Sequence, residues 1–482
     1  MSLFYSLIAL LPILSLLLLS LWRGVKSGIY VSTVITTVLF FFWGGEWQSF
    51  IASVFSALIG TVNILMIIFG AVFLYHVMEQ KKFVSGIQES LTETHPDNLF
   101  RFYFLTFFLT GFFESVAGFG TPGAIVPLLL ISMGFSPVLS VSVVLLFDGL
   151  LSFAGAVGTP ISAGLAIPLG LSDDLIKLVY TNSGMLIFIV GIVLLYSIYQ
   201  MTASEYPNGI KWWWLYFVIM LPVAILSGFL QEITGLIASV FLAFFAYTFL
   251  FTHKRIAFRP WLPYYLLVVV LLLPKVFPFF SEWLSYKVEF TSIYGTDINA
   301  ALQPFRSPLN PFLIAAFFAL FLANDYTVDL KPVIYKTTAV FLILFPSLGL
   351  TQLMLNSGGE QASMIDALSR LFSESGKAFP LISPFIGVLG TFISGSTTVS
   401  NVIFGGVQYS SAMTLGINEE IILSLQLCGA SLGNAICFFN IIAAGAVAGL
   451  NDYKEVLLKN LYPVLGAASV CSLLGYLFAN YF

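Results

Sequence analysis

The chain has 482 residues, of which 59% are hydrophobic and 9% are charged, and its mean hydropathy is +0.98. Soluble domains carry about 25% charged residues, so this composition indicates a polytopic membrane protein. The net charge of −4 and the lack of a basic cluster give no indication of a nucleic-acid partner. The three cysteines lie in apolar sequence without the spacing of metal ligands, so we expect no metal site and no cofactor.

A membrane-spanning helix needs about 20 mostly apolar residues, which predicts an all-α protein with about 12 transmembrane helices and two re-entrant hairpins. No basic residue precedes the first apolar run, so we expect it to remain as the first helix. In chain order the expected segments lie near 3–22, 27–44, 50–76, 80–98 (an amphipathic connection), 101–132 (a hairpin), 137–168 (a broken helix), 176–200, 212–229, 233–252, 260–278, 308–324, 333–355, 361–376 (amphipathic), 379–416 (a hairpin), 419–449 (a broken helix) and 455–481.

Glycine-rich interruptions inside apolar sequence predict the hairpins and broken helices. Residues 112–123 read FFESVAGFGTPG, and the Gly-Thr-Pro sequence at 120–122 recurs 38 residues later at 158–160. Gly395 and Gly433 are also 38 residues apart, and this second pair lies 275 residues after the first. Close packing of helices explains a single glycine equally well. Two matching pairs instead indicate the substrate site of a secondary transporter, because a broken backbone is tolerated in a bilayer only where protein or a water-filled cavity receives it.

The repeated offset divides the chain into four expected parts. Residues 1–49 form two N-terminal helices, and residues 50–200 form a first repeat. Residues 201–324 form four connecting helices, and residues 325–482 form a second repeat.

Basic short loops mark the cytoplasmic side of a membrane protein, and here they are expected on one side. Both termini then lie outside, and the helix at 50–76 runs in the opposite direction to its counterpart at 333–355. The repeats are therefore predicted to be inverted, with one hairpin opening to each side of the cell membrane. The basic side is marked by Arg23, Lys26, Lys81, Lys82, Lys211, the loop 253–255, Arg259, Lys331, Lys336 and Lys454, and the other side by Glu46, Asp173, Asp174, Gln231 and Glu232.

Four polar residues in apolar sequence are candidates for function. Intramembrane carboxylates are costly and face a cavity or a partner, and burial favours their protonated form. We expect Glu114 to couple transport to protons, and Asp148 either to share this role or to hold a hydrogen-bond network together. Asn401 and Asn434 are expected either to bind substrate or a cation, or to form interhelical hydrogen bonds. The expected substrate-binding residues are Ser115, Gly118, Gly120, Thr121, Gly158, Thr159, Ser394, Gly395, Ser396, Thr397, Thr398, Asn401, Gly433 and Asn434.

The stretches FFESVAGFGTPGAIVPLLL, AGAVGTPI and FISGSTTVSNVIFGG resemble the L-lactate permease family. Its members are proton-coupled carriers of lactate and glycolate that share inverted repeats, hairpins and broken helices. The resemblance implies that Glu114 corresponds to the family's glutamate before the GFGTP element, and residues 158–160 to its Gly-Thr-Pro break. A family aspartate is replaced by Thr397 and a family lysine by Asn434, which suggests that a buried ion pair has been lost.

We therefore expect a symporter that moves a small monocarboxylate such as L-lactate or glycolate together with protons, and not an enzyme. Half-helix N-termini, hairpin amides and hydroxyls would hold the carboxylate. The expected partners are this anion, the proton and the lipid bilayer, and the sequence leaves a homodimer open. A sodium-coupled carrier of the same fold and a passive channel remain alternatives. A membrane enzyme is disfavoured because the spans contain no HExxH, no aspartate pair and no Ser/His pairing.

Overall fold

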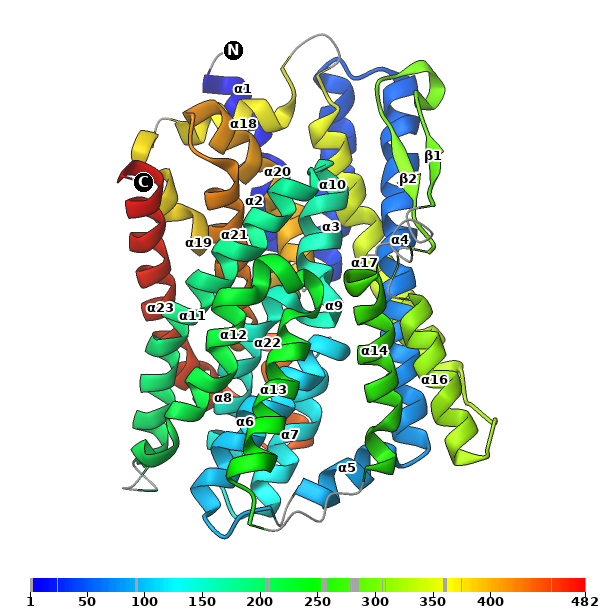
Figure 1. Ribbon diagram of the computed structural model, residues 1–482. Coiled ribbons are helices and arrows are strands. Elements are labelled where there is room, and N and C mark those ends of the chain that lie inside the picture. The colour runs from blue at the N-terminus through cyan, green and yellow to red at the C-terminus, as the bar shows by residue number, and fades with distance from the viewer. Residues whose placement is uncertain are drawn as a thin grey trace.

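The computed structural model describes residues 3–23, 25–91, 94–118, 120–203, 206, 209–252, 258–277, 279, 286–305, 307, 309–358, 362–373, 375–451 and 453–481. Helices make up nearly all of this structure and pack side by side (Figure 1). Within the described residues, nine helical segments are long and apolar enough to cross a membrane, and five shorter apolar helices accompany them. The expected all-α polytopic membrane fold is confirmed.

The chain begins with four helices of increasing length. A turn at Leu10 divides the first expected span into two. The amphipathic helix α5 follows α4 and runs across the lower end of the molecule in Figure 1. These five helices are α1 (Leu3–Ala9), α2 (Leu11–Arg23), α3 (Val25–Phe42), α4 (Trp47–Gln80) and α5 (Phe83–Leu91).

Helix α4 and helix α17 (Lys331–Leu355) pack against each other in opposite directions. At one end Lys81, directly after α4, donates a hydrogen bond to the carbonyl oxygen of Thr327, shortly before α17 (2.6 Å). At the other end Asn356, directly after α17, donates to the hydroxyl of Ser53 near the start of α4 (3.2 Å). The two helices that the offset of 275 residues relates are therefore antiparallel neighbours.

Two helical hairpins turn at glycines with a left-handed backbone. The φ angles are 57° at Gly118, 76° at Gly120 and 75° at Gly395, values that glycine adopts at little steric cost. Gly120 and Gly395, which are 275 residues apart, thus share one backbone conformation. In Figure 1 the first hairpin lies in the lower half of the molecule and the second in the upper half. The hairpins are formed by α6 (Asn98–Val116) with α7 (Thr121–Ser132), and by α19 (Phe379–Ser394) with α20 (Thr397–Leu415).

Each hairpin is followed by an interrupted helix, as the sequence predicts. The first consists of α8 (Pro137–Leu151), a 3₁₀ turn (Ser152–Ala154), α9 (Gly155–Ile161), a π-helical turn (Ser162–Ala166) and α10 (Ile167–Leu169). The second consists of α21 (Glu419–Gly433), a 3₁₀ turn (Asn434–Ile436) and α22 (Phe438–Val447).

The remaining helices cover and connect these elements. They are α11 (Asp173–Ala203), α12 (Trp214–Leu230), α13 (Thr234–Phe249), α14 (Leu262–Val276), α16 (Leu309–Ala323), α18 (Met364–Ser373) and α23 (Lys454–Tyr481), with 3₁₀ turns at Gly209–Trp212, Gln231–Ile233, Arg259–Trp261, Ile293–Gly295 and Gly376–Ala378.

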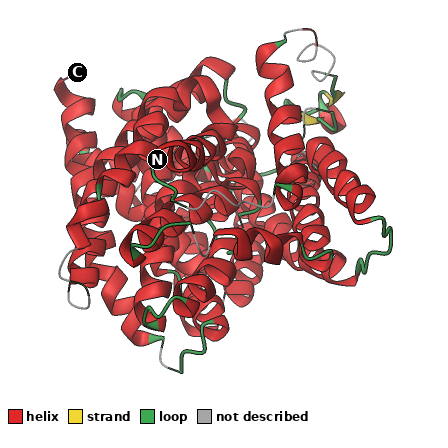
Figure 2. Ribbon diagram, turned by 60° about the horizontal axis from the view of Figure 1, so that its bottom comes forward, coloured by secondary structure: helices red, strands yellow, loops and turns green. Residues whose placement is uncertain are grey.

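One small sheet was not expected from the sequence. Strands β1 (Val288–Phe290) and β2 (Ala300–Leu302) pair antiparallel, and Figure 2 shows them at one edge of an otherwise helical molecule. Asn63 of α4 holds this sheet, because its amide donates to the carbonyl oxygen of Ala301 (2.7 Å) and accepts from the N–H of Gln303 (3.0 Å). The sheet therefore belongs to the α4 side of the molecule.

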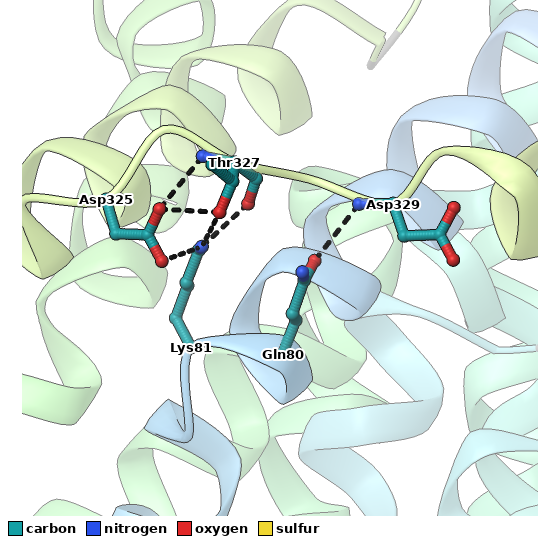
Figure 3. A network of polar contacts seen from close by, with 5 residues as sticks. All are labelled: Gln80, Lys81, Asp325, Thr327 and Asp329. Carbon is teal, nitrogen blue, oxygen red and sulfur yellow. Dashed lines mark hydrogen bonds and ion pairs between the residues drawn. The ribbon is translucent and has the colours of Figure 1, made fainter.

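The C-terminus of α4 is fastened to the segment between α16 and α17 (Figure 3). Lys81 Nζ lies 2.6 Å from Asp325 Oδ2, and the N–H of Asp329 donates to Gln80 Oε1 (3.4 Å). Hydrogen bonds from Lys81 and Thr327 hold the pKa of Asp325 well below its usual range. The ionised Asp325 thus ties α4 to the segment that leads into α17.

Other basic residues expected on one side also lie at this end. Arg259 donates to the carbonyl oxygen of Leu322, directly before that segment (2.7 Å). Lys211 pairs with Asp97 at the start of α6, beyond α5 (3.0 Å). The expected basic loop 253–255 lies outside the described residues.

Asp97 caps the N-terminus of α6 and fixes the entry of the first hairpin. Its Oδ1 accepts from the N–H of Leu99 (3.0 Å), and its Oδ2 accepts from Trp212 Nε1 (2.8 Å) and Lys211 Nζ (3.0 Å). Partial burial opposes the charge, but these hydrogen bonds hold the pKa of Asp97 below its usual value. The carboxylate therefore joins the first hairpin to the start of α12.

Replacing Asp97 with Ala should lower the thermal stability of the purified protein, by the equivalent of about 1 kcal/mol for the lost cap. A lowered folded pKa means that the stabilisation is present above the unfolded carboxyl pKa, about 4, and is lost as the pH falls through the folded value. The difference in melting temperature should therefore shrink in acid. Lys211→Met removes only one of the donors and should have a smaller effect. An Asp97→Ala variant as stable as the parent at neutral pH would show that the cap has no such role.

Candidate functional site

The first interrupted helix bends at three consecutive residues with a left-handed backbone. The φ angles are 43° at Ala156, 52° at Val157 and 73° at Gly158. For a β-branched residue such as Val157 this conformation costs about 1–3 kcal/mol and persists only where the surroundings fix it. The tip of the first hairpin supplies one such contact, because a Cβ placed on Gly118 would lie 3.0 Å from the Cβ of Ala156.

The opposite side of this bend packs against two elements outside the first hairpin. A Cβ placed on Gly158 would overlap the hydroxyl of Tyr180 on α11 and the backbone of Glu232. The turn Gln231–Ile233 therefore lies against the interrupted helix, an interior contact that the sequence does not reveal. Only glycine fits at position 158, both for its φ angle and for the space.

Glu114 and Asp148 face each other across the junction of α6 and α8. Glu114 is 5% exposed and Asp148 is 1% exposed, and their carboxyl groups are in direct contact. Glu114 Oε1 also lies against Gly155, where a Cβ would overlap it. Oε2 of Glu114 and Oδ1 of Asp148 have no hydrogen-bond donor among the described residues. We call Glu114 and Asp148 the carboxyl pair.

The second interrupted helix reaches the carboxyl pair through Asn434. Its Nδ2 donates to Asp148 Oδ2 (3.0 Å), and Asn440 Nδ2 donates to Asn434 Oδ1 (2.5 Å). Thr397 instead donates to the hydroxyl of Ser152 (3.2 Å). The idea that Thr397 and Asn434 replace an ion pair formed with each other is therefore not supported, since the two side chains have different partners. A lysine at position 434 would reach Asp148.

A chain of buried hydroxyls connects the second hairpin to both interrupted helices. Thr397 of α20 donates to Ser152, whose Oγ lies 2.9 Å from that of Ser431 on α21. Ser431 in turn donates to the carbonyl oxygen of Gly149 on α8 (2.7 Å). The sequence analysis missed Ser152 and Ser431, because single serines in membrane helices give no distinguishing pattern.

A cluster of amides fills the interface between α20, α21 and the first interrupted helix. Asn401 Nδ2 donates to the carbonyl oxygen of Pro160 (3.0 Å), and Gln426 Nε2 donates to Asn401 Oδ1 (3.3 Å). Gln408 Nε2 donates to Gln426 Oε1 (3.0 Å). These contacts are the interhelical hydrogen bonds expected as one role of Asn401. Gln408 and Gln426 were missed, although uncharged amides in apolar segments were a visible signal.

Two predicted hydroxyls point away from the carboxyl pair. Ser115 donates to the carbonyl oxygen of Gly111 (2.7 Å) and lies against Gly235 of α13. Thr159 donates to the carbonyl oxygen of Gly155 in its own turn (3.0 Å). Both hydroxyls therefore satisfy carbonyl groups of the interrupted backbone in the conformation shown.

Gly433 has a different role from the one its position suggests. Its φ angle is −59°, within a regular helix, and the chain departs from helical geometry at Cys437. A Cβ on Gly433 would overlap the carbonyl oxygen of Val388 on α19. This glycine allows close packing of α21 on the second hairpin, and the interruption follows it at residues 434–437.

The hairpin tips are the accessible part of this region. A Cβ placed on Gly120 would meet nothing within 4 Å, so the space above it is open. Ser396 caps α20 by accepting from the N–H of Val399 (3.3 Å), while Thr398 is buried behind it. The tip residues of intermediate exposure are Gly120, Thr121, Ser394, Gly395 and Ser396.

Two hairpins and two interrupted helices that meet at buried polar groups define a polytopic membrane protein with the architecture typical of secondary transporters. The chain belongs to the L-lactate permease family, whose family model matches residues 5–257 and 247–480.

Several curated relatives carry the name L-lactate permease. That of Streptococcus iniae is 26% identical, covering 86% of this chain and 92% of its own length. Those of Halalkalibacterium halodurans and Escherichia coli are 25% and 23% identical and cover 94% and 92% of this chain, and 92% and 90% of their own lengths. The solved structure of MtrF from Neisseria gonorrhoeae is similar with a TM-score of 0.45 and 13% identity, covering 87% of this chain and 81% of that chain.

Replacing Asn434 with Leu should lower thermal stability by the equivalent of about 1–3 kcal/mol, because Asp148 and Asn440 lose a buried partner. Asn434→Lys should largely retain stability, since its ammonium group can pair with Asp148. Asn480→Leu, at a partly exposed amide near the end of α23, is the matched control and should have little effect. If Asn434→Leu melts at the same temperature as the parent, Asn434 does not hold Asp148.

Proposed function

We propose that the protein is a secondary active transporter that carries a small monocarboxylate, such as L-lactate or glycolate, across the cell membrane together with a proton. The observation that carries this proposal is the contact between the buried carboxyl groups of Glu114 and Asp148 at the junction of the first hairpin and the first interrupted helix. The names of the relatives support lactate as the substrate.

The carboxyl pair is suited to hold one proton. Two carboxyl groups in contact cannot both be ionised at low cost, since like charges at short distance repel and burial removes the solvation of each. A single proton between them would provide a donor for Oε2 of Glu114 or Oδ1 of Asp148, the two oxygens without one. Binding and release of that proton then change the charge beside the hairpin tip.

The substrate anion would be held without a basic side chain. Residues 102–176 and 378–453, which contain both hairpins and both interrupted helices, include no Lys, Arg or His. The donors are the backbone amides and hydroxyls of the hairpin tips and the N-termini of α7 and α20. Each helix N-terminus carries about half an elementary charge, so two of them balance one carboxylate.

The proposal includes two inverted repeats, residues 50–200 and 325–482. The antiparallel packing of α4 on α17 and the equal φ angles of Gly120 and Gly395 support this relation. If the end that carries Lys81 faces the cytoplasm, both termini lie outside and the two hairpins enter from opposite sides. The tips would then become accessible in alternation.

Sodium coupling is the alternative that an experiment must separate from proton coupling. Carbonyl and amide oxygens near Asn401 are ligands that an alkali cation accepts. Uptake of labelled lactate into proteoliposomes, measured with a pH gradient at fixed sodium and with a sodium gradient at fixed pH, distinguishes the two. Uptake that equilibrates without responding to either gradient would indicate a passive channel.

Replacing Glu114 with Gln should abolish pH-driven accumulation of lactate, because the amide keeps the contact with Asp148 but cannot release a proton. A gradient of one pH unit, equivalent to about 1.4 kcal/mol, supports about tenfold accumulation by a one-to-one symporter. We expect accumulation ratios near one for Glu114→Gln, with exchange of labelled lactate partly retained.

Glu455→Gln is the matched control for this change. Glu455 is exposed and forms only a surface pair with Lys459 (3.5 Å), so its loss should leave accumulation unchanged. Parental accumulation by Glu114→Gln would remove Glu114 from the coupling step.

The lack of a basic residue in residues 102–176 and 378–453 also predicts substrate selectivity. A dicarboxylate such as malate would need about twice the compensating charge, which two helix termini do not supply. Malate should therefore compete poorly with labelled lactate at a pH where both of its carboxyl groups are ionised. Competition by malate as strong as that by unlabelled lactate would contradict the proposed anion site.

A further inference from the structure

The face of α6 that carries Glu114 contains two other buried polar side chains. Thr106 and Thr110 precede Glu114 by eight and four residues, so the three lie on one stripe of the helix. Both threonines are fully buried, and neither hydroxyl has a hydrogen-bond partner among the described residues.

The two ends of this stripe show that it faces α8. Phe102, at the far end, packs on Phe135 immediately before α8, with ring centroids 4.6 Å apart. At the near end Glu114 contacts Asp148 of α8. Ser140 precedes Asp148 by eight residues on the same stripe of α8, and its buried hydroxyl also lacks a partner in the described structure. Three unpartnered hydroxyls therefore lie in the apolar interface between α6 and α8.

Packing alone does not explain these hydroxyls. Other buried threonines, such as Thr36 and Thr61, donate to the carbonyl oxygen four residues earlier (2.8 and 2.7 Å). Ser115, the neighbour of Glu114, also bonds within its own helix. A buried hydroxyl without a partner is unfavourable, and a valine would fill the same volume without that cost.

We propose that Thr106, Thr110 and Ser140 form the proton path between the carboxyl pair and the end of the molecule at which α6 begins. This inference rests on the proposed function, because a path is needed only if the pair exchanges a proton. The helices that flank this face, α7, α8 and α9, contain no charged side chain other than Asp148. The path therefore offers no competing ionisable group.

The spacing of the hydroxyls suits transfer through single water molecules. Groups four residues apart on a helix are separated by about 6 Å along its axis, a gap that one bridging water spans. Each hydroxyl accepts one proton on a lone pair and releases its own proton to the next oxygen, so it is unchanged at the end. The carboxyl pair loses one proton, and bulk water gains it. In the conformation shown, Phe102 and Phe135 close the outer end.

The double variant Thr106→Val/Thr110→Val tests the path in the full-length protein reconstituted in proteoliposomes. It keeps the shape of both side chains and removes both hydroxyls. We expect the initial rate of lactate uptake driven by a pH gradient to fall by about tenfold, the scale of losing a positioned proton relay. Exchange of lactate at equal pH, which needs no net proton release, should stay close to that of the parent. Melting temperature should be unchanged or higher.

Two comparisons separate a proton path from a packing role. Thr61→Val removes a buried hydroxyl of α4 and should leave driven uptake unchanged, and Thr110→Ser should retain it because a hydroxyl remains. Transfer in heavy water should slow driven uptake by the parent more than exchange.

Parental rates of driven uptake in the double variant would overturn the path, and so would an equal loss of exchange and driven uptake with a lower melting temperature. A parent protein that exchanges lactate but ignores the pH gradient would instead refute the coupling, and the path with it.

Discussion

A polar group removed from water needs a partner inside the protein, and in a lipid bilayer no solvent supplies one. Four interruptions of helical backbone lie within this bundle, two at hairpin turns and two within helices. Each is held by contacts with another interruption or with a polar side chain. Asn401 accordingly satisfies the carbonyl oxygen of Pro160, and the tip glycine Gly118 packs on the strained backbone at Ala156. The carboxyl pair lies where these contacts converge.

The same requirement links the two halves of the chain. Asp148 is held by Asn434, and Ser152 by Thr397 and Ser431, so every one of these hydrogen bonds joins the first interrupted helix to the second repeat. Hydrogen bonds between neutral groups contribute about 1 kcal/mol each, far less than the cost of breaking a buried ion pair. Contacts of this strength can be exchanged one after another as a carrier changes conformation. Replacing a lysine by Asn434 fits this requirement.

The sequence predicted the helices, both hairpins and both interrupted helices well, because apolar length and glycine with proline are local signals. It also identified Glu114 and Asp148 as unusual residues. Their contact could not be derived, since the packing angle of α6 on α8 brings together residues 34 positions apart. Gly433 illustrates the opposite limit: the sequence shows a glycine in the right place, but only the structure shows that it serves close packing and that the break follows at Cys437. Ser152 and Ser431 gave no pattern at all.

A proton held between Glu114 and Asp148 can be observed directly by infrared spectroscopy of the purified protein at neutral pH. A shared proton predicts a protonated-carboxyl stretching band that shifts when the protein is transferred to heavy water. The band should change in both Glu114→Gln and Asp148→Asn, because each variant removes one member of the pair. Absence of a protonated-carboxyl band at neutral pH, or a band that neither variant alters, would contradict the shared proton and the coupling mechanism built on it.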